Sequence, residues 1–166
     1  GTFQFAPTPT QDASDVISIF SDAYPDVPVN YYNGYWEPWQ ETLSEDFEVN
    51  GDRILHYTEF NFVGIEFSSP TVDASAMTHL HVDIFIPGTL SSNAKMKLEL
   101  VDFGTGGTGA YMKDITTVQT QDWVSLDIPL SGFAGLSNRL QLAQIIFSDE
   151  NGNIESFYAD NIYFYK

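Results

Sequence analysis

The residues best suited to chemistry in this sequence are aromatic, and they crowd into one short segment. Between Tyr31 and Trp39 the chain reads YYNGYWEPW, so five of nine residues are Tyr or Trp. The Asn, Gly and Pro among them, and the lack of apolar and polar alternation, predict a loop. Aromatic faces pack against the axial C–H groups of a pyranose ring, and nearby amides and carboxylates bind its hydroxyls. This segment, the aromatic loop, is therefore a candidate site for sugar recognition.

Certain side chains of the aromatic loop are expected to contact a ligand, because exposed aromatic patches mark interaction surfaces. The two tryptophans are the leading candidates, the tyrosines add further ring faces, and an amide and a carboxylate form a polar rim. The expected ligand-binding residues are Trp36, Trp39, Tyr35, Tyr32, Gln40 and Glu41. In the alternative interpretation the rings form a lid over one open end of the fold and contact no ligand.

The acidic residues after the aromatic loop do not form a convincing catalytic pair. Glycoside hydrolysis needs two carboxyl groups at a controlled separation. The carboxylates between Glu41 and Glu48 instead alternate between the two faces of a predicted strand, which is typical of a solvated acidic strand. The chain also has no cysteine and no Gly-x-Ser-x-Gly motif. We therefore expect no enzymatic activity.

Two histidines offer a weaker possibility of a metal site. His79 and His81 are two positions apart, so on a strand both point the same way, as two ligands of a zinc site do. A third ligand is not evident, because His56 is distant in sequence. Paired surface histidines on a half-polar strand are the favoured interpretation.

The net charge limits the possible partners. The chain carries 23 Asp and Glu against 6 Lys and Arg, a net charge of −17. Such a field repels phosphate backbones and anionic lipid head groups, so neither nucleic acid nor a membrane surface is an expected partner. No apolar run approaches the ~20 residues of a membrane-spanning helix, so no membrane insertion is expected. Abundant carboxylates do supply the hard oxygen ligands that suit calcium.

The elements that position these residues are predicted to be strands. Short β-branched and aromatic runs recur between Gly, Pro, Asn, Asp and Ser clusters, and helical periodicity is nearly absent. We expect an all-β sandwich of two antiparallel sheets. The predicted strands are Val16–Phe20, Thr42–Val49, Ile54–Phe60, Val63–Phe67, His79–Phe85, Lys95–Val101, Lys113–Thr117, Trp123–Pro129, Gln141–Ser148 and Ser156–Phe164.

The 166 residues suit a single domain. Residues 1–10, with Pro7 and Pro9 among threonines, are predicted to be the remnant of an extended linker. Residues 11–166 would then form one module that is covalently joined to a neighbouring module.

Four segments together resemble a known family: APTPTQDASDVISIFSDAY at residues 6–24, LELVDFG at 98–104, WVSLDIPLSGFAGL at 123–136 and YADNIYFYK at 158–166. They are similar to the β-sandwich carbohydrate-binding modules of laminarinases and surface glycan-binding proteins of marine Bacteroidetes, broadly families 4, 16 and 22. The resemblance spans nearly the whole chain. It implies a jelly-roll sandwich of the galactose-binding-domain-like type, a structural Ca²⁺ near the two termini, and a glycan site built from aromatic residues.

The resemblance also points to residues for the calcium. Asp160 lies on the last predicted strand, where a carboxylate on an apolar face needs a partner. If the first and last strands pair, as the resemblance implies, Ser18 and Asp22 meet Asp160 and supply oxygen ligands for structural Ca²⁺. The alternative is a hydrogen-bonded surface aspartate without a metal.

We therefore expect a non-catalytic carbohydrate-binding module for a β-1,3-glucan such as laminarin. It would be a monomer, secreted or at a bacterial cell surface, and its neighbouring module could be a glycoside hydrolase. Two alternatives remain open. One is a structural spacer or protein-contact domain whose aromatic loop docks on the adjacent module, and the other is a glycan lyase or hydrolase on a jelly-roll scaffold.

Overall fold

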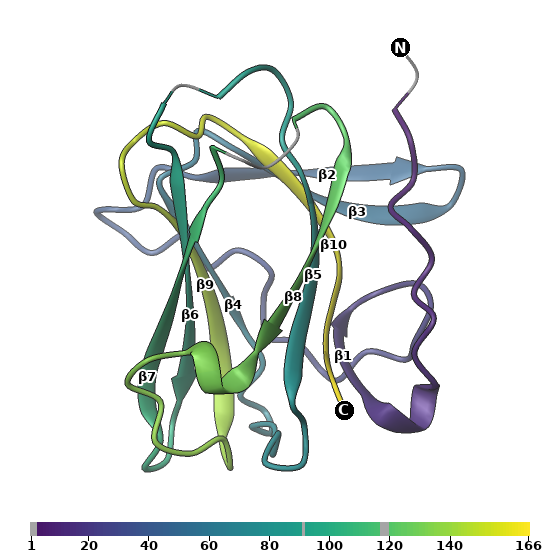
Figure 1. The fold of residues 1–166 in the computed structure, drawn as a ribbon, viewed down its shortest axis with the longest axis vertical. Coiled ribbons are helices and arrows are strands. Elements are labelled where there is room, and N and C mark those ends of the chain that lie inside the picture. Colours follow the sequence, from purple (N-terminus) through teal and green to yellow (C-terminus); the bar gives the residue numbers. More distant parts are fainter. Residues whose placement is uncertain (1–2, 91, 117–119) are drawn as a thin grey trace.

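The computed structural model describes residues 3–90, 92–116 and 120–166, and the described chain is almost entirely β (Figure 1). Two single turns of 3-10 helix, η1 (Ala13–Asp15) and η2 (Leu130–Gly132), interrupt the strands. The strands are β1 (Val16–Phe20), β2 (Leu43–Val49), β3 (Asp52–Thr58), β4 (Phe62–Glu66), β5 (His79–Phe85), β6 (Lys95–Asp102), β7 (Gly107–Asp114), β8 (Trp123–Pro129), β9 (Leu142–Asp149) and β10 (Phe157–Tyr165).

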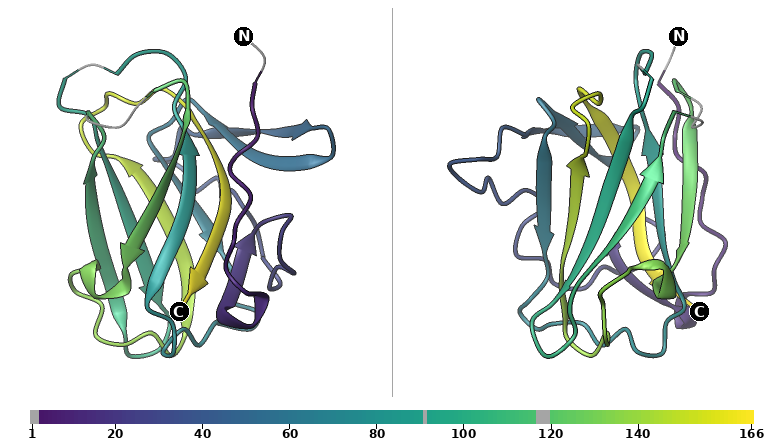
Figure 2. Two further views of the ribbon diagram at one scale, coloured as in Figure 1. Left: turned by 45° about the vertical axis from the view of Figure 1, so that its right-hand side comes forward. Right: turned by 60° about the vertical axis from the view of Figure 1, so that its left-hand side comes forward.

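The strands form two antiparallel sheets that pack face to face (Figures 1 and 2). The six-stranded sheet has the order β2-β3-β10-β5-β8, with β1 paired to β10 off this path. The four-stranded sheet has the order β4-β9-β6-β7. This arrangement confirms the predicted all-β sandwich of two antiparallel sheets.

Alternation along the strands places the core between the two sheets. In β5, Leu80 and Val82 are fully buried, and in β6, Met96, Leu98 and Leu100 are fully buried. The side chains between the β6 residues are only partly buried, because successive residues of a strand point to opposite faces. Each fully buried aliphatic side chain stabilises the fold by about 1.5–3 kcal/mol.

The predicted strand positions agree closely with the structure, except at β7. The sequence predicts a strand at Lys113–Thr117, and its glycine-rich segment Gly104–Gly109 (GTGGTG) predicts a flexible hairpin loop before that strand. Thr117 lies outside the described residues. The strand in fact begins at Gly107, within the glycine-rich segment. Glycine is required there because a Cβ at Gly109 would lie 2.6 Å from the Cβ of Leu136. The glycines thus allow close packing against another segment rather than a loose loop.

The prediction that residues 1–10 are only a linker remnant is corrected from Phe3 onward. These residues form no helix or strand, but they run across the outer face of the six-stranded sheet. The ring of Phe3 packs against those of Phe47, Phe85, Trp123 and Tyr158. The indole N–H of Trp123 donates to the carbonyl of Gln4 at 2.8 Å. The segment is therefore part of the folded module.

A charged network lies on the same outer face. His81 contacts Asp127 through Nδ1 at 2.7 Å and Asp83 through Nε2 at 2.8 Å, so both ring nitrogens are engaged by carboxylates rather than available to a metal. Burial by itself lowers the pKa of His81, but hydrogen bonds and charges from the two aspartates outweigh it and raise the pKa. The imidazole ring also stacks on Tyr163, with centroids 4.6 Å apart.

None of the helical segments in the described part of the chain has the length and apolar character needed to cross a membrane.

We predict that His81 makes part of the domain's stability depend on pH. Because its pKa is raised in the folded state, its contribution is fully present below the unfolded value of about 6.5. The contribution is lost as pH rises through the folded pKa. Urea unfolding across this range should therefore show the stability difference between wild type and His81→Asn shrinking as pH increases.

Asp127→Asn keeps the shape but removes one carboxylate, so it should move the NMR titration of His81 to lower pH. A pH-independent difference would contradict the assignment.

Candidate functional site

The aromatic loop is held against the outer edge of the four-stranded sheet. The main chain of Tyr31 pairs with Glu66 of β4, and the amide of Gly34 donates to the carbonyl of Gly64 at 3.2 Å. In the right-hand view of Figure 2 the loop projects beyond the edge of the sheet, next to β4. The loop therefore forms a wall beside the outer face of that sheet.

Trp36 is half-buried and lies flat over a glycine of β4. A Cβ at Gly64 would lie 2.2 Å from Cη2 of Trp36, and a Cβ at Gly34 would lie 2.1 Å from its Nε1. The indole Nε1 donates to the hydroxyl of Tyr31 at 3.0 Å, and that hydroxyl donates to Oε1 of Glu66 at 3.3 Å. Two glycines thus make room for the ring, and a short hydrogen-bonded chain fixes its orientation.

Gln40 and Asn61 hold the ends of the loop together. Gln40 accepts from the amide of Trp36 at 2.9 Å and donates to Asn33 at 2.7 Å and to the carbonyl of Thr42 at 3.0 Å. Asn61, from the turn before β4, donates to the carbonyl of Trp39 at 2.9 Å and accepts from the amide of Glu41 at 2.9 Å. The structure thus gives Gln40 and Asn61 roles in holding the loop together, and the sequence alone does not orient Asn61 toward the loop.

The remaining expected residues differ in exposure. Trp39 is 75% exposed, Tyr35 is 51% exposed, and Glu41 is exposed. Tyr32 instead turns inward: its hydroxyl donates to the carbonyl of Ile19 at 2.7 Å, and burial, together with the charge of Asp26, raises its pKa to about 12. The fold therefore presents only some of the rings to solvent.

The outer face of the four-stranded sheet continues the surface from Trp36. We call it the open face and define it by the outward residues of its strands, which neighbour one another across the sheet. Its members include Phe62, Glu66, Lys97, Glu99, Met112, Gln144 and Ile146. Gln144 donates to Glu66 at 2.7 Å, and Lys97 pairs with Glu99 at 3.6 Å. Sequence alternation could have found these positions, but not their adjacency to Trp36.

A cluster of carboxylates lies on the opposite side of the sandwich, where β1 and β3 meet β10. Asp22, Asp52 and Asp160 line a hollow of about 260 Å³ that residues 5–9 of the N-terminal segment close. Asp160 is 1% exposed, and its Oδ1 accepts from the amide of Asn161 at 2.7 Å. Asp52 was not expected from the sequence, because only the β3–β10 pairing brings it here.

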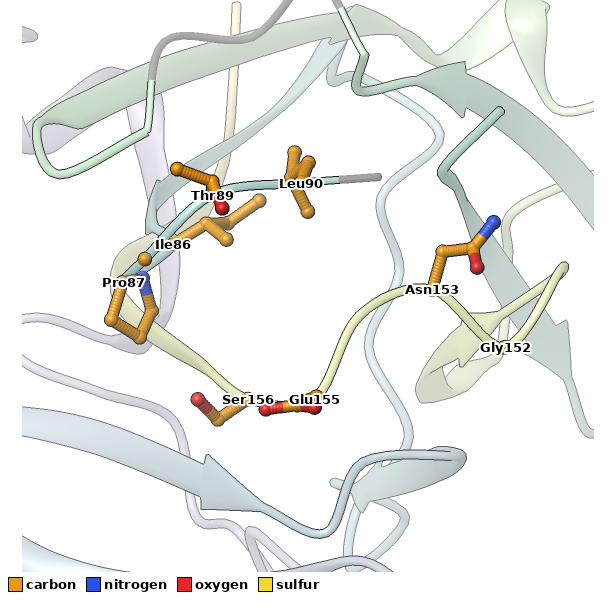
Figure 3. A pocket seen from close by; sticks show the side chains of 9 residues that line it. Ile86, Pro87, Thr89, Leu90, Gly152, Asn153, Glu155 and Ser156 are labelled. Atoms are coloured by element: carbon orange, nitrogen blue, oxygen red, sulfur yellow. The ribbon is translucent and has the colours of Figure 1, made fainter. Parts of the chain in front are cut away.

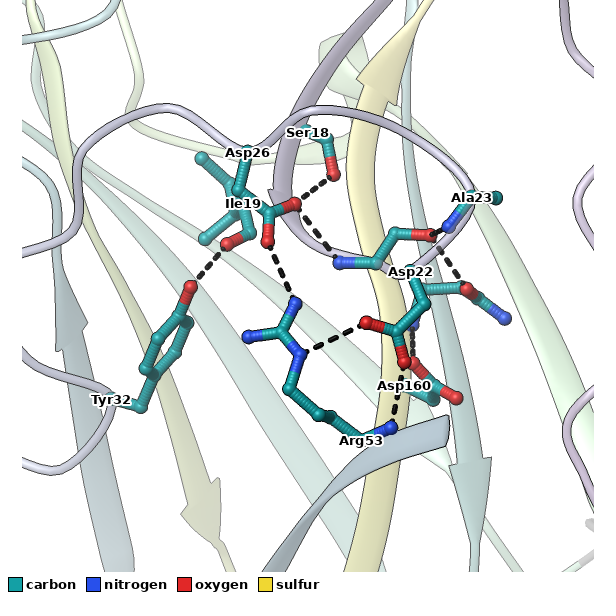
Figure 4. Close-up of polar contacts among 10 residues, drawn as sticks. Ser18, Ile19, Asp22, Ala23, Asp26, Tyr32, Arg53 and Asp160 are labelled. Atoms are coloured by element: carbon teal, nitrogen blue, oxygen red, sulfur yellow. Dashed lines mark hydrogen bonds and ion pairs between the residues drawn. The ribbon is translucent and has the colours of Figure 1, made fainter. Parts of the chain in front are cut away.

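Of the residues expected to bind calcium, Asp22 and Asp160 thus line one hollow, and Ser18 does not. Ser18 donates to Oδ1 of Asp26 at 2.7 Å. Figure 4 shows the guanidinium of Arg53 between Asp22 and Asp26, at 2.9 and 3.3 Å. One edge of the cluster is therefore neutralised by Arg53.

Burial and neighbouring negative charge both act on the carboxylates of this hollow. Burial, followed by the charges of neighbouring aspartates, raises the pKa of Asp160 to about 8. Burial and the adjacent Asp22 raise the pKa of Asp52 to about 6. No three His, Asp or Glu side chains within residues 3–90, 92–116 and 120–166 are already arranged to hold a metal ion. A cation here would need main-chain oxygens as well as the carboxylates.

A second hollow lies at one end of the sandwich, between the loops that follow β5 and β9 (Figure 3). Its volume is about 770 Å³. Its lining includes Leu90, Asn153 and Glu155 but no aromatic ring, so it lacks the stacking platform that a sugar site requires.

Comparison with solved structures shows the fold. A family 30 carbohydrate-binding module of a cellulosomal cellulase of Clostridium thermocellum is similar, with a TM-score of 0.64 and 17% identity over 90% of this chain and 96% of that one. A family 11 module from the same organism, in complex with a β-1,3-1,4-mixed-linked tetrasaccharide, has a TM-score of 0.57 and 18% identity, covering 77% of this chain and 84% of that one. A family 28 module specific for non-crystalline cellulose has a TM-score of 0.55 and 16% identity, covering 74% of this chain and 80% of that one.

No protein-family model and no curated protein sequence matches the chain. The solved structures show that the chain has the β-sandwich fold of carbohydrate-binding modules. The similar structures belong to families 11, 28 and 30, and the expected likeness to families 4, 16 and 22 and to marine Bacteroidetes stays a prediction.

We predict that Gly64→Ala displaces Trp36 and loosens the aromatic loop. The added methyl group would overlap the six-membered ring of the indole, and overpacking of this kind costs about 1–3 kcal/mol. The indole N–H resonance of Trp36 should shift, and the free energy of unfolding should fall. Gly132→Ala is a matched control, because the nearest atom to its new Cβ is 3.6 Å away. Equal effects of the two substitutions would show that Trp36 does not depend on Gly64.

Proposed function

We propose that this module binds a neutral β-glucan without acting on it, and that a β-1,3-glucan such as laminarin is the preferred ligand. The observation that carries the proposal is the group of rings at the β4 edge, where the centroid of Trp36 lies 6.5 Å from that of Tyr31 and 6.4 Å from that of Phe62. The same loop carries Trp39, which is 75% exposed. Ring surface gathered at one edge of the sheet suits the apolar faces of sugar residues.

Polar groups beside the rings suit sugar hydroxyls. Glu66 and Gln144 lie next to Tyr31, and Lys97 and Glu99 lie further across the open face. Carboxylate, amide and ammonium groups provide both acceptors and donors, so they can orient a ligand that carries both. An apolar edge and a polar floor together match the amphipathic faces of a pyranose chain.

Charge favours a neutral polysaccharide over an acidic one. The chain carries a net charge of −17, and carboxylates occur both in the aromatic loop and on the open face. A polymer of uronic acids or sulfated sugars would meet like charge at long range and again at contact.

The arrangement of carboxylates supports binding rather than hydrolysis. Glu45 pairs with His56 on one side of the β2–β3 hairpin, whereas Glu48 lies opposite Arg53 on the other side. Carboxyl groups on opposite sides of a hairpin cannot flank one glycosidic bond.

The spacer alternative has one observation in its favour. A tryptophan that is 75% exposed could dock on an adjacent module instead of a sugar. We favour the glycan because the rings at the β4 edge adjoin the polar groups Glu66 and Gln144 of the open face, which a protein contact does not require. We propose a monomer, secreted or at a bacterial surface, that holds a covalently linked module such as a glycoside hydrolase near its polysaccharide.

We further propose that structural Ca²⁺ binds in the hollow between the termini. Asp22, Asp52 and Asp160 supply carboxylate oxygens, and residues 5–9 supply main-chain carbonyls nearby. The ligand chemistry fits, because Ca²⁺ takes 6–8 oxygen ligands in flexible geometries. Bound Ca²⁺ would offset the repulsion between these carboxylates, and it would tie the N-terminal segment to β10.

We predict that Trp36→Ala and Trp39→Ala each weaken binding of laminarihexaose by about tenfold or more, because each removes a ring face worth ~1.4 kcal/mol. Calorimetric titration should show this loss at an unchanged melting temperature for Trp39→Ala. Phe103→Ala removes a comparably exposed ring, 50% exposed and outside the loop, and should leave binding intact. Binding of cellohexaose but not laminarihexaose would change the proposed linkage from β-1,3 to β-1,4. Self-association without any glycan binding would favour the spacer.

We predict that Ca²⁺ raises the melting temperature and that EDTA reverses the rise. At a hundredfold excess over Kd the stabilisation is about 2.7 kcal/mol. Asp160→Asn should abolish the response, because it removes the most buried carboxylate of the hollow. Asp73→Asn, a carboxylate exposed elsewhere, should retain it. Identical melting of the wild type in Ca²⁺ and in EDTA would remove calcium from the proposal.

A further inference from the structure

A groove runs along the underside of the β2–β3 hairpin. Its volume is about 450 Å³, within the range of small-ligand pockets. In Figure 1 this hairpin extends away from the body of the sandwich, so that one of its faces is not covered by the opposite sheet. We call the space beneath it the hairpin groove.

The walls of the hairpin groove are aromatic and aliphatic. Phe20 and Tyr32 pack edge to face with centroids 5.3 Å apart and form one wall, and Leu55 and Tyr57 line the hairpin side. The guanidinium of Arg53 lies 5.0 Å from the centroid of the Phe20 ring and closes one end. Tyr57 is fully buried and Phe20 is 4% exposed, so the apolar surface that the groove offers to a ligand comes mainly from the partly buried Tyr32 and Leu55.

Hydrogen-bonding groups border this apolar surface. The strand register places Ser44 opposite Tyr57, and Glu48 opposite Arg53. Ser44 and Glu48 both line the groove, and they lie four positions apart along β2, roughly 13 Å at 3.3 Å per residue. Such a length suits more than one sugar ring.

The hairpin groove joins the aromatic loop. The hydroxyls of Tyr35 and Ser44 are hydrogen-bonded at 3.0 Å, and Asn33 donates to Ser44 at 3.1 Å. Tyr35 therefore reaches toward the groove, whereas its neighbour Trp36 covers β4. The loop separates two surfaces, and each receives some of its rings.

The charges around the groove select against an anionic ligand. Arg53 is already paired with Asp22 and Asp26, at 2.9 and 3.3 Å. Glu48, opposite Arg53 on the same face of the hairpin, adds further negative charge at the lining. A neutral ligand rich in hydroxyl groups fits both the aromatic walls and the carboxylates.

We infer that the hairpin groove is a second glycan-binding region, which takes sugar residues of the same neutral polysaccharide as they pass beyond Tyr35. Tyr32 provides an apolar wall, and Ser44 and Glu48 bind sugar hydroxyls. The inference rests on the proposed function, because it assigns a further part of the module to the same ligand. It also explains why Tyr32 and Tyr35 belong to the aromatic loop although neither faces β4.

The test uses chain length. Laminaritriose can occupy one surface, whereas laminarihexaose can extend from the aromatic loop into the groove. Wild-type protein should bind the hexaose at least about tenfold more tightly than the triose. Glu48→Ala removes a hydrogen bond to a charged group, so it should cut affinity for the hexaose by about tenfold and leave affinity for the triose unchanged. Glu155→Ala is the matched control, because it removes an exposed carboxylate at the far hollow.

A second measurement tests the groove even if the loss of one carboxylate changes the affinity for the hexaose only slightly. Amide NMR shifts of Ser44, Glu48 and Arg53 should respond to the hexaose and not to the triose. If the hexaose binds, but Glu48→Ala does not weaken its binding and these shifts do not respond to it, the groove inference is wrong and the proposed function stands. If neither oligosaccharide binds, and cellohexaose does not bind either, the proposed function fails and the groove inference fails with it.

Discussion

Strand β10 can pair with only one neighbour at each point along each edge, and the rest of the molecule is arranged around this constraint. On one edge, Phe157–Ala159 pairs with β3, and the chain from Ile162 onward pairs with β1. The change of partner coincides with a bulge after Asp160, where Asn161 has φ of 49°. The divergence of β1 from β3 leaves space on both faces of the sheet. The carboxylate hollow lies on one side, and the hairpin groove lies near Arg53 on the other.

Asn161 stabilises this bulge through its side chain. Its amide donates to Asp83 at 2.8 Å and to the carbonyl of Pro7 at 3.2 Å, and it accepts from Ser21 at 2.9 Å. These bonds join β5, the N-terminal segment and the residues after β1 to one residue of β10. Asn tolerates the left-handed conformation better than most residues, because its short side chain bonds locally. One residue of the bulge thus holds the N-terminal segment and the residues after β1 against β10.

Much of the fold could be predicted from the sequence, because strand alternation is a local property. β1, β5 and β8 begin and end at the predicted residues, since each is a clear run bounded by turn residues. β7 could not be located, because its glycines serve contacts with Phe133 and Leu136, which are distant in sequence. The fold is also similar to that of solved carbohydrate-binding modules, although the sequence identities are below 20%.

The candidate site was predictable only in part, because its residues meet through pairing between distant strands. The density of rings identified the aromatic loop, but not which rings turn inward. The hydroxyl of Tyr32 is hydrogen-bonded to the carbonyl of Ile19, and the side chain of Gln40 is hydrogen-bonded within the loop. The spacing of these residues in the sequence does not reveal either contact. Asp52 joins Asp160 only because β3 pairs with β10. Phe3 reads as part of a linker until the aromatic cluster beneath it is known.

The rigidity of the aromatic loop has a consequence for affinity. Shallow sugar sites gain only a few ring contacts, and any loop that must become ordered on binding reduces that gain by about 0.5–1.5 kcal/mol per immobilised side chain. Here Gln40 and Asn61 already tie the loop at both ends, and Gly34 and Gly64 fix Trp36 before a ligand arrives. The ordering cost falls mainly on Trp39, which is the most exposed ring. A preorganised wall with one mobile ring would let a small module hold a polysaccharide reversibly, and a tethered neighbour would then benefit from the raised local concentration.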